Sequence, residues 1–334
     1  MKRLLTVLLS ALLIVACVFS LTACSDGGSE GDGKTGLLIK KVGNVYNIYD
    51  YVDDGTLTDG VLDIASILKE KNIESARIKK GTFDGVTTIK TLIVPDSVIE
   101  IEEGAFKNMS GLVTLEVPFV GKNAKADAYQ NQTPAAVNKA VNREKTFAHF
   151  FGTTEYSGGT TLIDIYGETY YVPTKLKTVK INATDKVKYG VGTLKEEAYS
   201  IPEKAFSGVI TLQNVELVGV NINEIGENAF KDCKGLTSIT IPSTVKNIYT
   251  NAFSGCSNLT SVEILGDNVN LYAGAFEGCT SIDKIATETG ATINVGKFNQ
   301  IGKNAFNFGN SKEYNVLNKG SFDLASIFGE TKIK

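Results

Sequence analysis

A ladder of phenylalanines that recurs about every 23 residues restricts the fold more than any other feature of the sequence. An aliphatic residue stands five positions before each ring, and a small residue stands directly before it. Another aliphatic residue follows six positions after every ring except the last. A period of this length is typical of solenoids, in which each repeat forms one turn of a coil. The ladder comprises Phe83, Phe106, Phe206, Phe230, Phe253, Phe276 and Phe306.

Each repeat also contains a short phrase with strand-like alternation. The clearest case is Leu236-x-x-Ile239-x-Ile241, which is followed by Pro242. Apolar residues at every second position predict a short strand with one buried face, and the proline ends its pairing because it has no N–H to donate. One such unit cannot bury its apolar face alone, so stacked units must share a continuous core. We therefore expect a β-rich solenoid of short parallel strands with few helices.

The turn before each ring has its own signature. Asparagine or glycine stands two positions before most of the rings, which predicts a tight turn with positive φ. The small residue that follows lets the backbone turn inward at a crowded corner.

The combined pattern I-x-x-x-A-F-x-x-C-x-x-L-x-x-I-x-I-P extends over about residues 78–306. It resembles the BspA-like leucine-rich repeats found in surface proteins of bacteria and some protists. This resemblance implies a leucine-rich-repeat solenoid, display at the cell surface and a role in adhesion or host-protein binding. The functional part of that implication is an analogy between folds.

The N-terminus has the composition of an export signal. Lys2 and Arg3 precede an almost wholly apolar segment, which ends in Leu21-Thr22-Ala23-Cys24. The last four residues resemble the lipobox of bacterial lipoproteins. That resemblance implies that residues 1–23 are removed and that Cys24 carries a diacylglycerol anchor. The alternative is a membrane-spanning anchor, but no basic stop-transfer cluster follows the apolar segment.

Composition divides the remainder into a tether, two caps and the repeat array. Residues 24–36 are rich in glycine, serine and acids and predict a flexible tether. Residues 37–77 predict an N-terminal cap, with strands at 37–42 and 45–52 around Gly43-Asn44 and a helix at 60–71 capped by Thr58 or Asp59. Residues 78–312 form the solenoid. The array is predicted to end at Lys312, which replaces the expected aliphatic residue. Residues 313–334 form a C-terminal cap, because segment 323–328 resembles segment 63–68.

Residues 119–172 are predicted to be an insertion, because the step from Phe106 to Phe206 is far longer than one repeat. A helix is expected from Pro134 to Phe151, stopped by Gly152. Two apolar phrases after it could pair as a hairpin. Aromatic residues gather in this insertion and suggest a recognition surface. The alternative is that the rings pack the insertion onto the solenoid, which applies above all to Phe147, Phe150 and Phe151. The candidate ligand-binding residues are Tyr129, Tyr156, Tyr166, Tyr170 and Tyr171.

Three cysteines repeat with the array and could suggest a metal site or disulfides. Cys233, Cys256 and Cys279 each follow a ladder ring by three positions. Other repeats have valine or methionine at this position, so we interpret the cysteines as small buried hydrophobic residues. A single column also lacks the clustered spacing that zinc requires. We expect no metal site and no cofactor.

Catalysis is not expected. The chain has one histidine, His149, which excludes any two-histidine zinc site. Residues 27–31 match G-x-S-x-G and residues 28–35 match a phosphate-binding loop, but neither match has the strand and helix that these motifs require. A net charge of −3 gives no reason to expect nucleic acid. The sequence predicts a lipid-anchored binding protein on the extracellular face of the bacterial cell membrane, with a protein or glycan partner. The alternative is a structural or accessory envelope lipoprotein.

Overall fold

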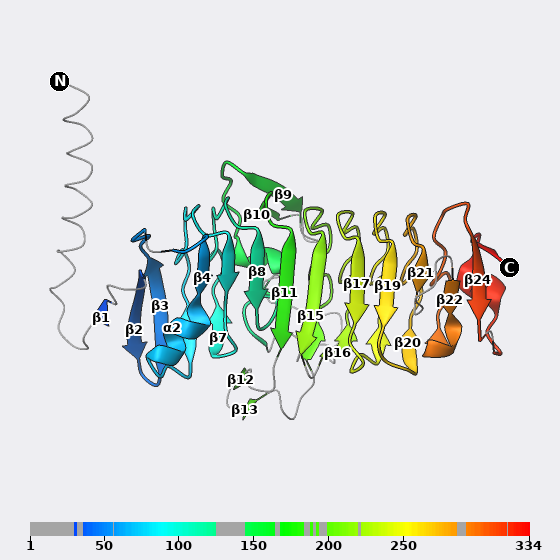
Figure 1. Cartoon of the computed structure of the whole chain (residues 1–334), viewed down its shortest axis with the longest axis horizontal. Coiled ribbons are helices and arrows are strands. Elements are labelled where there is room, and N and C mark those ends of the chain that lie inside the picture. The colour runs from blue at the N-terminus through cyan, green and yellow to red at the C-terminus, as the bar shows by residue number, and fades with distance from the viewer. Residues whose placement is uncertain are drawn as a thin grey trace, which may run out of the picture.

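The described residues of the computed structural model form one elongated coil, with β2 near one end and β25 near the other (Figure 1). The structure describes the chain except residues 1–29, 32–35, 56, 125–143, 164–167, 184–187, 190–191, 194–198, 220–221, 286–291 and 319. Most strands pair in parallel with the equivalent strand of the next turn. The predicted leucine-rich-repeat solenoid, β-rich with few helices, is confirmed.

One side of the coil is an eleven-stranded sheet whose strands are all parallel. Register is strict: Ile239 pairs with Val262 and Ile241 with Ile264, so apolar residues meet apolar residues along the rod. The strands are β4 (Val61–Asp63), β6 (Thr91–Ile93), β8 (Thr114–Val117), β11 (Thr178–Ala183), β15 (Asn214–Gly219), β17 (Ser238–Ile241), β19 (Ser261–Ile264), β21 (Lys284–Ile285), β22 (Thr292–Asn294), β24 (Glu313–Leu317) and β25 (Lys332–Ile333).

Two further sheets of five strands each form a second face of the coil. They carry the aliphatic residues that precede the rings by five positions, and all of these except Ile301 are fully buried. The first sheet contains β1 (Glu30–Gly31), β2 (Leu37–Val42), β3 (Val45–Tyr51), β5 (Ala76–Ile78) and β7 (Val98–Ile101). The second contains β14 (Tyr199–Ile201), β16 (Ile222–Ile225), β18 (Asn247–Ile248), β20 (Val269–Leu271) and β23 (Phe298–Ile301).

The ladder phenylalanines form a stacked column inside the coil. All seven rings are fully buried. From Phe206 to Phe276 neighbouring ring centroids are 5.0–5.1 Å apart and the ring planes are within 6° of parallel. This separation is close to the spacing of paired strands, so each turn sets its ring directly on the ring of the turn before.

The residue two positions before each ring has positive φ in every repeat, as predicted. Asparagine or glycine occupies this position in all repeats except one. Lys204 is the exception, with φ 57°. A residue other than glycine, asparagine or aspartate is strained in this left-handed region, because its Cβ comes close to the following carbonyl oxygen.

The long step between Phe106 and Phe206 contains one complete turn of the solenoid, so residues 119–172 are not wholly an insertion. Strand β8 pairs directly with β11, with Leu115 opposite Val179. On the ring side, Phe106 N–H donates to the Phe150 carbonyl (2.8 Å) and Phe147 N–H donates to the Ala205 carbonyl (2.8 Å). The eleven-stranded sheet and the ring column therefore continue through this region, whereas the second face is divided between its two sheets. Segments that leave this single turn account for the length of the step between the two rings.

The helix predicted at 134–151 is wrong over its described residues. Residues 144–151 form turns and a short 3₁₀ helix, η2 (Phe147–Phe150). The carbonyls of His149 and Phe150 accept hydrogen bonds from Gly104 and Phe106 of the preceding turn. The Phe147 N–H donates to the Ala205 carbonyl of the following turn, so it is not available to the carbonyl four residues earlier, as an α-helix requires. Residues 134–143 lie outside the described residues.

The N-terminal cap contains the expected strands, but its helix begins later than predicted. Helix α2 (Ile64–Glu70) is capped by Asp63, whose carboxylate accepts from the Ser66 N–H (3.2 Å) and hydroxyl (2.6 Å). The assignment of the cap to Thr58 or Asp59 was wrong, because residues 61–63 pair with β6 as strand β4. Within the predicted tether, Glu30 and Gly31 pair with β2 as strand β1.

The parallel stacking of strands continues past Lys312, where the sequence predicts the end of the repeats. Strand β24 pairs in parallel with both β22 and β25. Tyr314 on β24 is fully buried, and its hydroxyl donates to the Ile282 carbonyl (2.7 Å). Helix α4 (Leu324–Phe328) repeats the Asp cap of α2 through Asp323, and Phe328 packs 5.2 Å from the last ladder ring. The C-terminal segment thus covers the rod by completing another turn. The remaining elements are β9 (Gly159–Ile163), β10 (Thr169–Pro173), β12 (Lys188–Tyr189), β13 (Gly192–Thr193) and η3 (Val295–Lys297).

Candidate functional site

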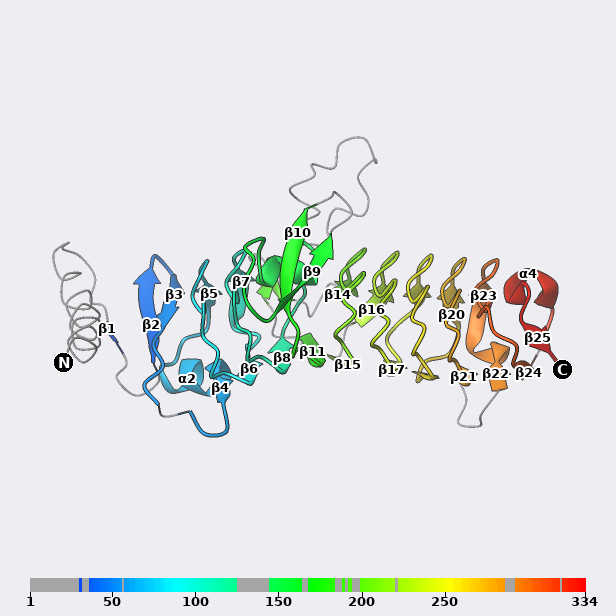
Figure 2. The same ribbon diagram turned by 90° about the horizontal axis from the view of Figure 1, so that it is seen from above.

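The predicted hairpin after η2 is confirmed. Strands β9 and β10 pair antiparallel, with Tyr170 opposite Leu162 and Tyr171 opposite Thr161. The hairpin stands off the middle of the rod in both views (Figures 1 and 2). It is therefore the most prominent irregular feature of the described surface.

Tyr170 is not available to an external ligand, which corrects its prediction as a binding residue. Its side chain is 1% exposed, whereas that of Tyr171 is partly exposed. Successive residues of a strand point to opposite faces, so one of two adjacent tyrosines must turn inward. The sequence could not show which of the two would do so.

Tyr156 is partly buried and packs against Gly159. Its ring atoms lie 3.1 Å from the position that a Cβ at Gly159 would occupy. Burial raises the pKa of its phenol, and the buried hydroxyl has no hydrogen-bond partner among the described residues. The ring thus packs the base of the hairpin. Tyr129 and Tyr166 lie outside the described residues, so they remain predictions together with Tyr171.

Phe147, Phe150 and Phe151 fill the phenylalanine column where the long turn interrupts it. Phe150 lies 5.4 Å from Phe106, and Phe147 lies 5.0 Å from Phe206. All three rings are fully buried. The packing interpretation therefore holds for these residues.

His149 is buried beside them and has a structural environment. Its Nε2 lies 3.2 Å from the Ile101 carbonyl, which only a protonated ring nitrogen can approach as a donor. Burial lowers the pKa of His149 to about 4, so the ring is neutral at physiological pH. A neutral imidazole that donates to a backbone carbonyl in the core is not placed to exchange protons with a substrate.

The three repeat cysteines are buried free thiols, as predicted for small hydrophobic residues. Each Sγ donates to the carbonyl of the ladder phenylalanine one turn earlier, at 3.0–3.1 Å. Burial raises the pKa of the Cys233 and Cys279 thiols, which keeps them protonated. Among the residues that the structure describes, no three His, Cys, Asp or Glu side chains come together as a metal site.

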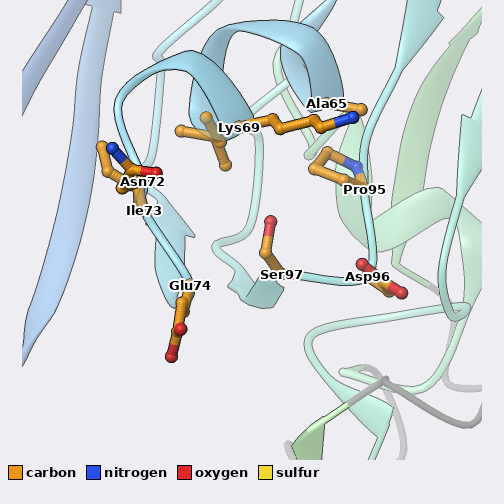
Figure 3. A pocket seen from close by; sticks show the side chains of 9 residues that line it. Ala65, Lys69, Asn72, Ile73, Glu74, Pro95, Asp96 and Ser97 are labelled. Atoms are coloured by element: carbon orange, nitrogen blue, oxygen red, sulfur yellow. The ribbon is translucent and has the colours of Figure 1, made fainter.

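A shallow groove of about 610 Å³ lies beside the N-terminal cap (Figure 3). Helix α2 and the loop at residues 95–97 form its walls, and Lys69 extends along the helix toward Pro95. Its charged residues are Lys69, Glu74 and Asp96. Its lining contains neither histidine nor cysteine. The remaining lining residues are Ala65, Leu68, Asn72, Ile73 and Ser97.

The second face of the coil carries a feature that the sequence analysis missed. Tyr249 and Tyr272 stack on each other with ring centroids 4.9 Å apart, and both are partly exposed. A signal was present, because each tyrosine directly follows the aliphatic residue that precedes a ladder ring by five positions.

A parallel-stranded solenoid with a stacked ring column defines the chain as a leucine-rich-repeat protein. Residues 63–139 and 191–311 match the model of the BspA type leucine rich repeat region, in six copies. The chain therefore belongs to this family. A search of curated proteins gave no match.

Three solved structures illustrate the similarity to leucine-rich-repeat proteins. The chain is 16% identical to a leucine-rich-repeat protein of T. pallidum, with 82% of this chain and 86% of that chain covered and a TM-score of 0.34. It is 17% identical to a leucine-rich-repeat protein of Bacteroides ovatus, with 94% and 76% covered and a TM-score of 0.34. It is also 17% identical to a leucine-rich cell surface protein of Faecalibacterium prausnitzii, with 84% and 74% covered and a TM-score of 0.34.

No helix within the described ranges is both long and apolar enough to cross a bilayer. Cys24 and the apolar segment before it lie outside those ranges.

Proposed function

We propose that this protein is a non-catalytic binding protein, attached by lipid at Cys24 to the extracellular face of the bacterial cell membrane. The observation that carries the proposal is the set of BspA type repeats, which build one long surface of exposed side chains in strict register. Proteins that stack short repeats commonly use such extended surfaces for binding. The lipobox supports the location, and the relative from Faecalibacterium prausnitzii is described as a cell surface protein.

The ligand is an extracellular protein or glycan. The hairpin adds a second contact region to the repeat surface, because it stands off the rod and carries the partly exposed ring of Tyr171. Aromatic side chains of this kind contribute strongly to interfaces at a low cost in conformational entropy. Catalysis has no part in the proposal, since His149 and the repeat cysteines are buried in structural roles.

The test is binding of the full-length protein, solubilised in mild detergent, to arrays of extracellular-matrix proteins and mucin glycans. We expect retention on at least one array element and a weaker signal for Tyr171→Ala. Tyr49→Ala is the matched control, because Tyr49 is 38% exposed and lies on the distant strand β3. An array without signal, combined with a crosslinked membrane partner, would support a structural or accessory envelope role instead.

A further inference from the structure

Two neighbouring columns of side chains lie on the outer side of the sheet formed by β16, β18, β20 and β23. Strand pairing sets Glu224 beside Asn247, and Asn247 beside Asn270. Two residues further along each turn, the second column contains the stacked tyrosines Tyr249 and Tyr272. The N–H groups of Tyr249 and Tyr272 continue the ladder one residue beyond strands β18 and β20. Residues two apart in such extended backbone point to the same side, so amides and aromatic rings form one surface.

The tyrosine pair ends at a glycine on each side. The N–H groups of Gly226, Tyr249, Tyr272 and Gly302 each donate to an aliphatic residue's carbonyl in the preceding turn, at 2.7–2.9 Å. The four residues therefore occupy equivalent positions. The glycines are also required sterically, because a Cβ at Gly226 or Gly302 would lie within 2.6 Å of backbone atoms. Consequently no side chain of the same column stands next to the outer face of either ring.

The amide column holds its side chains in fixed orientations. Asn270 Nδ2 donates to Asn247 Oδ1 (2.9 Å), and Asn247 Nδ2 donates to Glu224 Oε1 (3.0 Å). Asn299 Nδ2 extends the ladder by donating to Asn270 Oδ1 (2.9 Å). A carboxamide has two N–H groups and an oxygen with two lone pairs, so each of these bonds leaves hydrogen-bonding capacity toward solvent.

Glu224 connects the two columns. Its Oε1 also accepts from the Tyr249 hydroxyl (3.1 Å), and its Oε2 accepts from the Ser200 hydroxyl (3.2 Å). Stacking and this hydrogen bond fix the Tyr249 ring before any ligand arrives, which lowers the entropy cost of binding. Glu224 supplies the only formal charge in the two columns.

We propose that this surface binds a neutral glycan built of hexopyranose units. The aliphatic C–H face of a sugar ring carries partial positive charge and packs against the negative face of an aromatic ring, here Tyr272 and Tyr249. Sugar hydroxyls both donate and accept, as do the amides of Asn247 and Asn270, and Glu224 accepts from a further hydroxyl. An acidic glycan finds no cation in either column. The inference rests on the proposed function and names the ligand class and its site.

Affinity electrophoresis of the full-length protein in mild detergent tests the inference. The gels contain soluble β-glucan, galactomannan or, as an acidic comparison, heparin. We expect at least one neutral polysaccharide to retard the protein, and Tyr272→Ala to weaken that binding at least tenfold. Asn270→Ala should weaken it several-fold, whereas Tyr272→Phe, which retains the ring, should bind as the parent does. Tyr49→Ala serves as the exposed control, and a thermal melt of each variant verifies that the solenoid is intact.

The inference is overturned if no neutral polysaccharide retards the protein, if heparin alone does so, or if Tyr272→Ala binds with parental affinity. Should neutral polysaccharides fail while a protein array still retains the parent and loses Tyr171→Ala, this inference falls and the proposed function stands. Should both the arrays and the polysaccharides remain without signal, both fall.

Discussion

Different side chains adopt one backbone conformation at the turn before each ladder ring. Asn228, Asn251 and Asn304 have φ of 55–56°, and glycines serve the same position in other turns. Asparagine tolerates this left-handed region better than other non-glycine residues. The backbone geometry therefore accounts for asparagine and glycine at this position.

Lys204 departs from this rule, so Lys204→Asn should stabilise the protein by about 0.5–1 kcal/mol. The Lys204 N–H that donates to the Glu227 carbonyl is retained in the variant. Chemical denaturation compares the two proteins, with Asn251→Lys as the reverse substitution, which should destabilise. Equal midpoints for all three proteins would contradict the strain argument.

Buried His149 makes stability depend on pH. Its folded pKa of about 4 lies below the ordinary value of 6.5, so between these values the unfolded chain binds the additional proton. The free energy of unfolding should therefore rise with pH across this window and fall by about 3 kcal/mol as pH drops from above 6.5 to 4.

Urea unfolding at several pH values, compared between the parent and His149→Gln, isolates this contribution. The glutamine amide can still donate to the Ile101 carbonyl but does not titrate in this range. Parallel pH profiles for the two proteins would show that His149 does not carry the effect.

Each turn is a single structural element that depends on its neighbours. The ring of Phe253 lies 5.0 Å from that of Phe230 and 5.1 Å from that of Phe276. Removing it leaves a cavity flanked by two rings and by the buried thiol column. The inter-turn hydrogen bonds hold the backbone around such a cavity, so it collapses only in part.

Phe253→Ala should consequently cost about 3–5 kcal/mol and fray the central turns. Phe253→Leu keeps more of the volume and should cost less. Thermal and chemical denaturation measure the loss, and hydrogen exchange locates it. A melting curve that Phe253→Ala leaves unchanged would contradict the view that packing along the ring column stabilises the fold.

The regular elements could be predicted from the sequence, because the same residue pattern occurs in every turn. Seven observations of the same pattern fixed the strands, the ring column and the left-handed turn. The helix expected at 134–151 failed in its described part, because the Phe147 N–H donates to the Ala205 carbonyl of the following turn rather than within its own segment. Local propensity contains no information about such a partner.

The candidate site was less accessible to sequence reasoning. The insertion is rich in aromatic residues, and this density alone suggested its five tyrosines as binding residues. Whether Tyr170 points inward or outward depends on the orientation of its strand, which a single irregular segment does not reveal. Tyr249 and Tyr272 occupy a predictable repeat position, yet their stacking depends on the register between turns. That register places two residues 23 positions apart in direct contact.

At the scale of the whole molecule, the rod has a defined end from which the membrane attachment is expected. Strand β1 pairs with β2 at the N-terminal end, only a few residues after Cys24. Anchoring at that position would attach the rod by one end and leave both faces accessible.

Cys24→Ala should abolish lipidation, because we propose that the diacylglycerol group attaches through that thiol. We expect the variant to lose labelling by a fatty-acid probe and to leave the membrane fraction, with its circular dichroism unchanged. Cys256→Ala is the control for a cysteine outside the signal and should label as the parent does. Persistent labelling of the Cys24 variant would refute the anchor.

The matched register of successive turns has one more consequence. A turn meets only the turn before it and the turn after it, and the turns centred on Phe230 and Phe253 present nearly the same contacts to both. Copying or deleting one such unit in the gene would change the length of the rod by a single step while leaving every remaining junction intact. Such a change would alter how far the rod extends from the cell. It would also alter the number of positions at which a partner can bind, and the packing between turns would stay the same.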